Sequence, residues 1–181
     1  MNYTQSLSVR SEDLLRHLHD LRTGTYEGTK SRNAKEELYR RGVQWLTPVA
    51  IAVLEEANAL FLKNTGSTQV IGPERDSMNG LVTRFELSWP EQRSAHVAHG
   101  LSKALEPVCI IVDFSQNFLH PHLAGSTAGF WPFQVINESD AERQRGILVA
   151  IVEMELHRCI FETDWRIFPV SPTPPQDAPG F

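Results

Sequence analysis

The sequence contains little cysteine, with only Cys109 and Cys159 in 181 residues. A disulfide framework needs several cysteines, and a cysteine metal cluster needs closely spaced pairs. Neither pattern is present, and both cysteines lie inside apolar runs. We therefore expect two reduced, buried thiols that pack as small apolar side chains.

Long apolar runs and basic clusters are also missing. No stretch reaches the roughly 18 uninterrupted apolar residues of a membrane span, and the N-terminal segment lacks the basic-then-apolar order of a signal peptide. The formal net charge is -5, and the lysines and arginines are scattered along the chain. We expect a cytoplasmic protein that binds neither a membrane nor nucleic acid.

Motifs that prescribe a reaction are absent as well. There is no glycine-rich phosphate loop, no Gly-x-Ser-x-Gly turn and no His-Glu-x-x-His helix, so no cofactor is expected. With 181 residues, 41% of them hydrophobic, the chain is long enough for one domain with a substantial core. We expect a polar arm with a short helix at 1–30, one α+β domain at 31–168, and a disordered proline-rich tail at 169–181.

Three helices are predicted before the first strand. Ser11 is a plausible N-cap for a helix that ends near Thr23 and carries its leucines on one face. Asn33 opens a second helix, which runs to about Trp45. A Thr-Pro pair then signals a restart, and a third helix from Pro48 to Leu62 is apolar on every side, as expected of a buried helix.

The hydrophobic period then changes from helical to alternating. Thr68–Ile71 is a short strand, and Gly72–Asp76 is a turn or bulge. Asn79-Gly80 predicts a two-residue hairpin. The segment Leu81–Trp89 alternates between apolar and polar residues, which predicts an antiparallel strand with one face exposed to solvent.

The second half of the domain centres on the most apolar strand. After a polar connection at Glu91–Glu106, with a helical turn expected at Leu101–Leu105, Val108–Val112 should be a central strand covered on both faces. Gln116–Gly129 is too rich in helix and strand breakers for regular structure and predicts an ordered loop. Phe130–Ile136 predicts an edge strand, because it contains a proline.

A final helix is predicted from the capping box at Ser139 to about Phe161. Its β-branched residues also suit a strand, but the cap and the length favour a helix. The fold class is therefore α+β, with a small antiparallel sheet of about four strands flanked by N-terminal helices and one C-terminal helix.

The candidate site lies in Glu106–Ile136, where the central strand leads into a His-Pro-His loop. His120 and His122 stand two residues apart across a proline, which in an extended segment places both rings on one side and could begin a metal site. A third ligand would have to come from elsewhere: Asp113, His96, His99 or His157. None of these has a diagnostic spacing to the pair.

A second interpretation of the loop is favoured. Pro121 would shape the turn while the imidazoles bond to backbone groups, so no metal is assigned. His17 and His19 point in different directions from the first helix and are interpreted as surface residues. Cys109 is rejected as a nucleophile, because a thiol in a buried strand has a raised pKa and no access.

Three short segments together resemble the middle of the ubiquitin-conjugating enzyme fold. They are Phe85–Glu91, Glu106-Pro107-Val108 leading into Phe114, and Phe118–Leu123 with its following glycine. That family has a strand ending in a Phe-Pro or similar pair, a proline-led next strand and a His-Pro-Asn loop before the active site. The order of elements also agrees, and the resemblance covers about half of the chain.

The chain departs from this family where the chemistry occurs. Conjugating members need a cysteine shortly after the loop to carry the thioester, and the loop asparagine to stabilise the oxyanion. Here His122 takes the place of the asparagine, and no cysteine lies between His122 and Cys159. Ser126 and Thr127 supply hydroxyls but no thiol. The resemblance therefore implies an inactive variant or an RWD domain, which keeps the fold as a platform for binding proteins.

We expect a non-catalytic interaction or adaptor subunit of a larger assembly, with a ubiquitin-like protein or another complex subunit as its partner. The oligomeric state is left open. The alternative is an enzyme, or a small-ligand or metal-binding protein, centred on His120 and His122. The candidate binding residues are Trp89, His120, Pro121, His122, Phe130 and Trp131.

Overall fold

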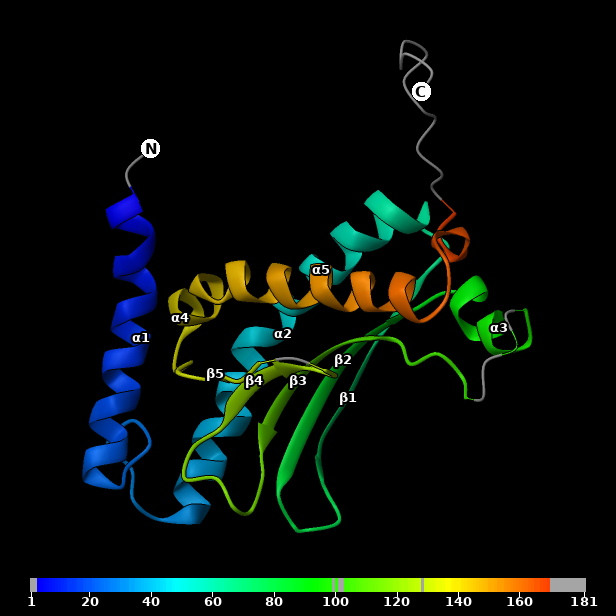
Figure 1. Ribbon diagram of the computed structural model, residues 1–181. Helices are drawn as coiled ribbons and strands as arrows, with labels where there is room; N and C mark the ends of the chain where they lie inside the picture. The colour runs from blue at the N-terminus through cyan, green and yellow to red at the C-terminus, as the bar shows by residue number, and fades with distance from the viewer. Residues whose placement is uncertain (1–2, 99, 101–102, 128, 170–181) are drawn as a thin grey trace.

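The computed structural model describes residues 3–98, 100, 103–127 and 129–169, with side chains from residue 11 onward. Within these residues the fold is α+β, as predicted, with five α-helices and a five-stranded antiparallel sheet (Figure 1). The elements in chain order are α1 (Tyr3–Thr23), α2 (Arg32–Leu62), β1 (Ser67–Arg75), β2 (Leu81–Ser88), α3 (Pro90–Ala98), β3 (Val108–Phe114), β4 (His122–Gly125), β5 (Trp131–Pro132), α4 (Glu138–Arg143), α5 (Arg145–Glu162) and the 3-10 turn η1 (Trp165–Ile167).

The sheet is a meander in which each strand pairs with the next along the chain. The predicted alternation in β2 is confirmed, because its residues from Leu81 to Leu87 are buried at every second position. They lie beside the buried residues of β3, with Phe85 opposite Ile110, so one face of the sheet is apolar. On the other face of β2, Arg84 is exposed. β3 is the central strand, as predicted.

Helices α2 and α5 pack on the apolar face of the sheet, and the core lies between them and the strands. Figure 1 shows the two helices crossing each other on one side of the sheet, with α1 upright beside the edge that ends in β5. α2 is long and apolar enough to cross a membrane by length and composition alone. Its apolar residues line the core of the domain, which accounts for that composition.

The prediction of two helices between residues 33 and 62 is wrong, because α2 continues through Pro48. An interior proline costs about 3 kcal/mol in an isolated helix. Here buried residues on both sides of it, such as Leu46 and Val49, belong to one core, and their burial favours a continuous helix. The helix is capped by Ser31, whose hydroxyl accepts a hydrogen bond from the Ala34 amide, rather than by Asn33.

The ends of two other helices also differ from the prediction. α1 begins at Tyr3 rather than after Ser11. The C-terminal helix is confirmed as a helix, but it is divided at Gln144 into α4 and α5. Asn137, not Ser139, caps α4 by accepting a hydrogen bond from the Asp140 amide at 2.9 Å. Sequence signals locate helices better than helix ends, because several polar residues near an end can serve as the cap.

The pairing of β1 with β2 shows how the bulge and the hairpin turn compare with the prediction. The bulge at Gly72-Pro73 is confirmed by a register shift in the β1–β2 pairing. The hairpin loop has five residues instead of two, because Asp76 accepts hydrogen bonds from the Gly80 amide at 2.7 Å and the Met78 amide at 2.8 Å and so closes a wider turn.

Two more segments that were predicted as connections contain regular structure. Residues 90–98 form α3, with Pro90 in the first turn, where its missing amide costs nothing. Residues 122–125 form β4, because β3 supplies hydrogen-bonding partners that no local pattern can show. Of the helical turn expected at Leu101–Leu105, residues 101–102 lie outside the described residues, and residues 103–105 are not helical. The proline-rich tail from residue 170 on also lies outside the described residues.

Candidate functional site

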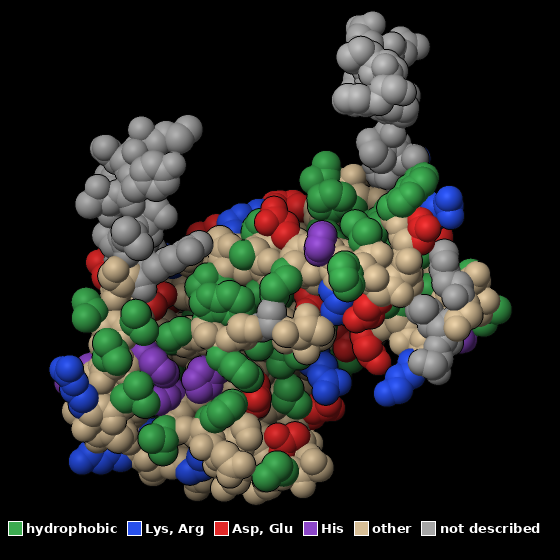
Figure 2. Space-filling view, in the orientation of Figure 1, with side chains coloured by type: hydrophobic (Ala, Val, Ile, Leu, Met, Phe, Trp, Pro, Cys, Tyr) green, Lys and Arg blue, Asp and Glu red, His purple; other side chains and the backbone are tan. Residues whose placement is uncertain are grey.

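Three histidines converge where α1 meets the connection between β3 and β4. His17 comes from α1, His120 from the loop, and His122 is the first residue of β4. One ring nitrogen of each lies within 4.8 Å of the other two. The ring centroids of His17 and His120 are 4.5 Å apart, and those of His17 and His122 are 5.7 Å apart. Figure 2 shows histidine side chains gathered beside α1.

Each of these rings has a buried nitrogen without a hydrogen-bond partner among the described residues. The atoms are Nδ1 of His17, Nε2 of His120 and Nδ1 of His122. His120 is only 2% exposed, so water has little access to it. A buried polar atom left unpaired costs about 1–3 kcal/mol. The three-histidine cluster therefore contains three unsatisfied nitrogen atoms, one on each ring.

Burial also sets the protonation state of the cluster. Loss of solvent lowers the pKa of His17, His120 and His122 below the ordinary histidine value. The pKa of His120 is lowered the most, to about 4, because its two histidine neighbours add to the effect of burial. The three rings are therefore neutral near pH 7. Neutral imidazole is the form that binds a metal ion.

The loop that carries His120 is held from two sides. The buried ammonium of Lys35 donates to the carbonyl of Leu119 at 3.0 Å and to that of Gly24, just after α1, at 3.1 Å. The Phe133 amide donates to the carbonyl of Pro121 at 3.2 Å. These bonds satisfy backbone groups on both sides of His120, so the ring position is set by the surrounding structure.

Aromatic rings form the other wall of the cluster. The rings of Phe118 and Phe130 lie edge-on to His122, with centroids 4.7 Å and 5.8 Å away. Phe130 is 66% exposed, so the apolar wall reaches the surface beside His122. An apolar wall keeps competing hydrogen-bond partners away from the ring nitrogens.

The geometry fits a tetrahedral metal ion after a small adjustment. A zinc ion with bonds of about 2.0–2.1 Å to nitrogen separates its ligands by roughly 3.3 Å. The ring nitrogens lie up to 4.8 Å apart, so the rings would move inward by up to roughly 1 Å when an ion binds. Asp113 is the cross-strand partner of His122, but it does not join the group. Among the described residues the group comprises three ligands, which leaves one tetrahedral position for water or an outside ligand.

Sequence reasoning found two members of this cluster and missed the third. The interpretation of His17 as a surface residue is wrong, because it is half-buried against His120 and His122. Of the proposed third ligands, Asp113, His96 and His157 do not join the group, and His99 lies outside the described residues. The signal that could have found His17 is the polar stripe that it forms with Asp13 and Asp20 along one face of α1.

The other predicted binding residues are divided between core and surface. Trp89, predicted as a binding residue, is fully buried, and its indole N–H donates to the carbonyl of Ile167 at 2.7 Å. The ring of Phe168, just after η1, lies against the Trp89 ring with centroids 5.5 Å apart, a contact that no local pattern reveals. Trp131 is half-buried in β5, Pro121 is buried, and Phe130 is exposed.

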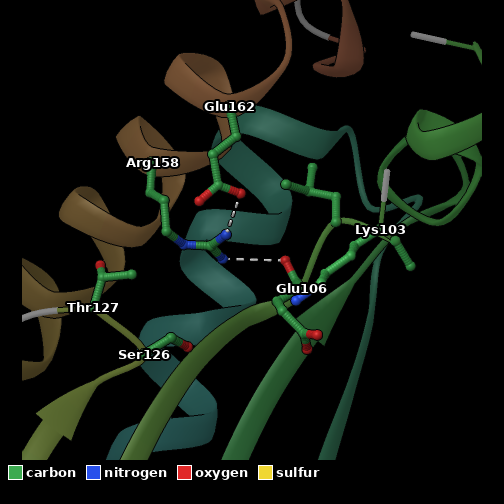
Figure 3. Close-up of a pocket in the computed structure, with 8 residues that line it drawn as sticks. Lys103, Glu106, Ser126, Thr127, Arg158 and Glu162 are labelled. Atoms are coloured by element: carbon green, nitrogen blue, oxygen red, sulfur yellow. Dashed lines mark hydrogen bonds and ion pairs between the residues drawn. The ribbon is translucent and has the colours of Figure 1, made fainter. Parts of the chain in front are cut away.

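A hollow of about 490 Å³ lies beside the turn after β4 (Figure 3). The fully buried carboxylate of Glu155 accepts hydrogen bonds there from the amides of Ser126 and Thr127 at 2.9 Å and 3.3 Å. Arg158 donates to the same carboxylate at 3.1 Å and pairs with Glu162 at 3.0 Å. The Thr127 hydroxyl also donates to this carboxylate, at 3.3 Å, so Glu155 holds the turn through both backbone and side-chain groups.

An apolar groove of about 390 Å³ lies at the far end of α5, where η1 packs beside it. Trp165 is 53% exposed on its rim, and Phe161 nearby is 86% exposed. The remaining apolar lining consists of Phe61, Leu156, Ile160 and Phe168. Large exposed apolar side chains gathered in one place are typical of surfaces that bind proteins.

Comparisons with protein-family models, with curated proteins and with solved structures found no match for this chain. The resemblance to ubiquitin-conjugating enzymes therefore remains a prediction from short motifs. A function has to be argued from the chemistry of the sites themselves.

Proposed function

We propose that this protein binds a divalent transition-metal ion, with Zn²⁺ as the favoured ion, through His17, His120 and His122. The observation that carries the proposal is that three neutral ring nitrogens lie within 4.8 Å of one another in a partly buried cluster. Imidazole nitrogen is a preferred ligand of Zn²⁺, and Zn²⁺ accepts tetrahedral geometry.

A bound metal ion would make the histidine cluster stabilising instead of destabilising. Without a partner, the buried nitrogens oppose the arrangement in which they lie, whereas a bound ion would take one nitrogen of each ring as a ligand. With three protein ligands, the ion would keep one position for water or an outside ligand, as zinc does in catalytic sites. The proposal is thus a metal site with one exchangeable position, next to the exposed ring of Phe130.

The test is zinc titration of the full chain, expressed without a histidine tag and stripped with a chelator. We expect about one Zn²⁺ per chain by calorimetry and by elemental analysis. Alanine substitution of His17, His120 or His122 should each weaken binding by roughly tenfold or more, because two imidazoles hold zinc less well than three.

His19→Ala is the matched control, because His19 lies on the same helix but is exposed and outside the cluster. It should bind zinc as the wild-type chain does. Wild-type affinity in all three cluster variants, or no zinc bound to the wild-type chain, would contradict the proposal.

As a second candidate function, we propose that the protein is an adaptor subunit that binds another protein. The apolar groove with Trp165 on its rim supports this function. We also propose that the chain is a ubiquitin-conjugating-like or RWD domain without the catalytic cysteine. Its support is the order of elements, in which an antiparallel meander with the His-Pro-His loop lies between a long helix and two later helices.

A further inference from the structure

We infer that metal binding at the three-histidine site controls the docking of α1 on the rest of the domain. This inference rests on the proposed metal site and adds a regulatory role to it. His17 is on α1, whereas His120 and His122 belong to the β3–β4 connection, so an ion held by all three would link the helix to the sheet.

The face that α1 turns toward the domain is polar. Asp13 and Asp20 are buried on that face, and Arg16 and His17 are half-buried. The leucines on the other side are 41–64% exposed: Leu14, Leu15, Leu18 and Leu21. No described side chain of α1 belongs to the hydrophobic core. The hydrophobic effect, which holds most helices in place, therefore contributes little to the docking of residues 11–23 of α1.

Hydrogen bonds and ion pairs hold α1 on the domain instead. Asp13 accepts hydrogen bonds from Gln144 at 2.8 Å and from Arg143 at 3.4 Å, and Asp20 accepts one from Gln134 at 3.1 Å. Arg16 pairs with Asp140 at 3.4 Å. The arginine side chains in these pairs are 28–29% exposed and their carboxylate partners are 5% and 12% exposed. The cost of taking these charges out of water offsets much of their mutual attraction.

The histidine cluster determines whether the docking of α1 is favoured. When α1 docks without a metal ion, it brings three imidazoles together with buried nitrogens that have no partner, which opposes docking. When an ion is present, one nitrogen of each ring becomes a ligand, and the cluster favours docking. Ion and helix are then coupled reciprocally, because the docked helix completes the site and the filled site holds the helix.

Hydrogen exchange measured by mass spectrometry tests the inference directly on the full chain. Saturating Zn²⁺ should slow amide exchange in peptides from residues 11–23 by roughly fivefold or more. Peptides from the core segment 49–62 of α2 should not change, and they also report whether each variant is folded. His17→Ala should lose the effect on α1, while His19→Ala should keep it.

The outcomes separate this inference from the proposed function. If native mass spectrometry shows one bound zinc ion and exchange in α1 is unchanged, control of docking is overturned and the metal site stands. If no zinc binds, the proposed function fails, and the inference fails with it.

A second measurement uses residues that cannot be ligands. Arg143 contacts Asp13 on α1, whereas the nearby Arg145 pairs with Glu56 on α2. If docking and zinc binding are coupled, Arg143→Ala should weaken zinc binding about three- to tenfold. The substitution takes a partner from the buried carboxylate of Asp13, which costs more than the pair itself contributes, so fewer molecules hold α1 in the competent position. Arg145→Ala should leave the affinity unchanged. Equal zinc affinities in the two variants would overturn the inference.

Discussion

At the scale of single residues, the thiols are the groups whose chemistry the structure restricts most. Burial raises the pKa of Cys109 to about 12 and that of Cys159 to about 11, so almost no thiolate forms near neutral pH. We expect neither thiol to react with a maleimide within minutes in the native protein, and both to react after unfolding in guanidinium. Rapid labelling of either cysteine in the native state would show that a thiol is accessible, and would reopen a thioester role.

At the scale of elements, the contact between α2 and the segment after β5 depends on one glycine. A Cβ atom at Gly42 would lie 2.6 Å from the carbonyl oxygen of Val135 and 2.9 Å from the ring of Phe133. Gly42→Ala should therefore lower the free energy of unfolding by about 1–3 kcal/mol, measured by urea denaturation. Gly146→Ala is the control, because nothing lies within 4 Å of its added Cβ in α5. That variant should gain about 0.5–1 kcal/mol, and equal effects in both would contradict the packing argument.

At the scale of the whole molecule, the adaptor function predicts a partner that covers the groove at the end of α5. Trp165→Glu would place a charge on the groove's exposed rim, which should abolish capture of a protein partner from the native host. Met78→Glu, 57% exposed at the hairpin turn, should leave capture unchanged. Thermal melts of both variants would check folding. If the wild-type chain captures no stable partner, or if both variants capture it equally, the adaptor function loses its support.

Local sequence patterns correctly predicted the elements that carry their own periodicity, apolar run or cap. The alternation in β2 and the apolar run of β3 gave correct strands, and the capping signals before residue 140 gave a helix in the right place. β4 was missed because four residues with a glycine carry no strand signal without β3 beside them. α2 was divided in two because a proline signal is local, whereas the core that keeps the helix continuous is not.

For the site, the sequence by itself determined that His120 and His122 share one loop and that no cysteine follows them closely enough for a thioester relay. Only the tertiary structure decided that His17 completes the cluster, that Trp89 is buried and that α1 docks through its polar face. The physical reason is distance along the chain. Residue periodicity records which side of an element is apolar, but a contact between residues 17 and 120 leaves no local pattern. It exists only once the sheet and α1 have been brought together.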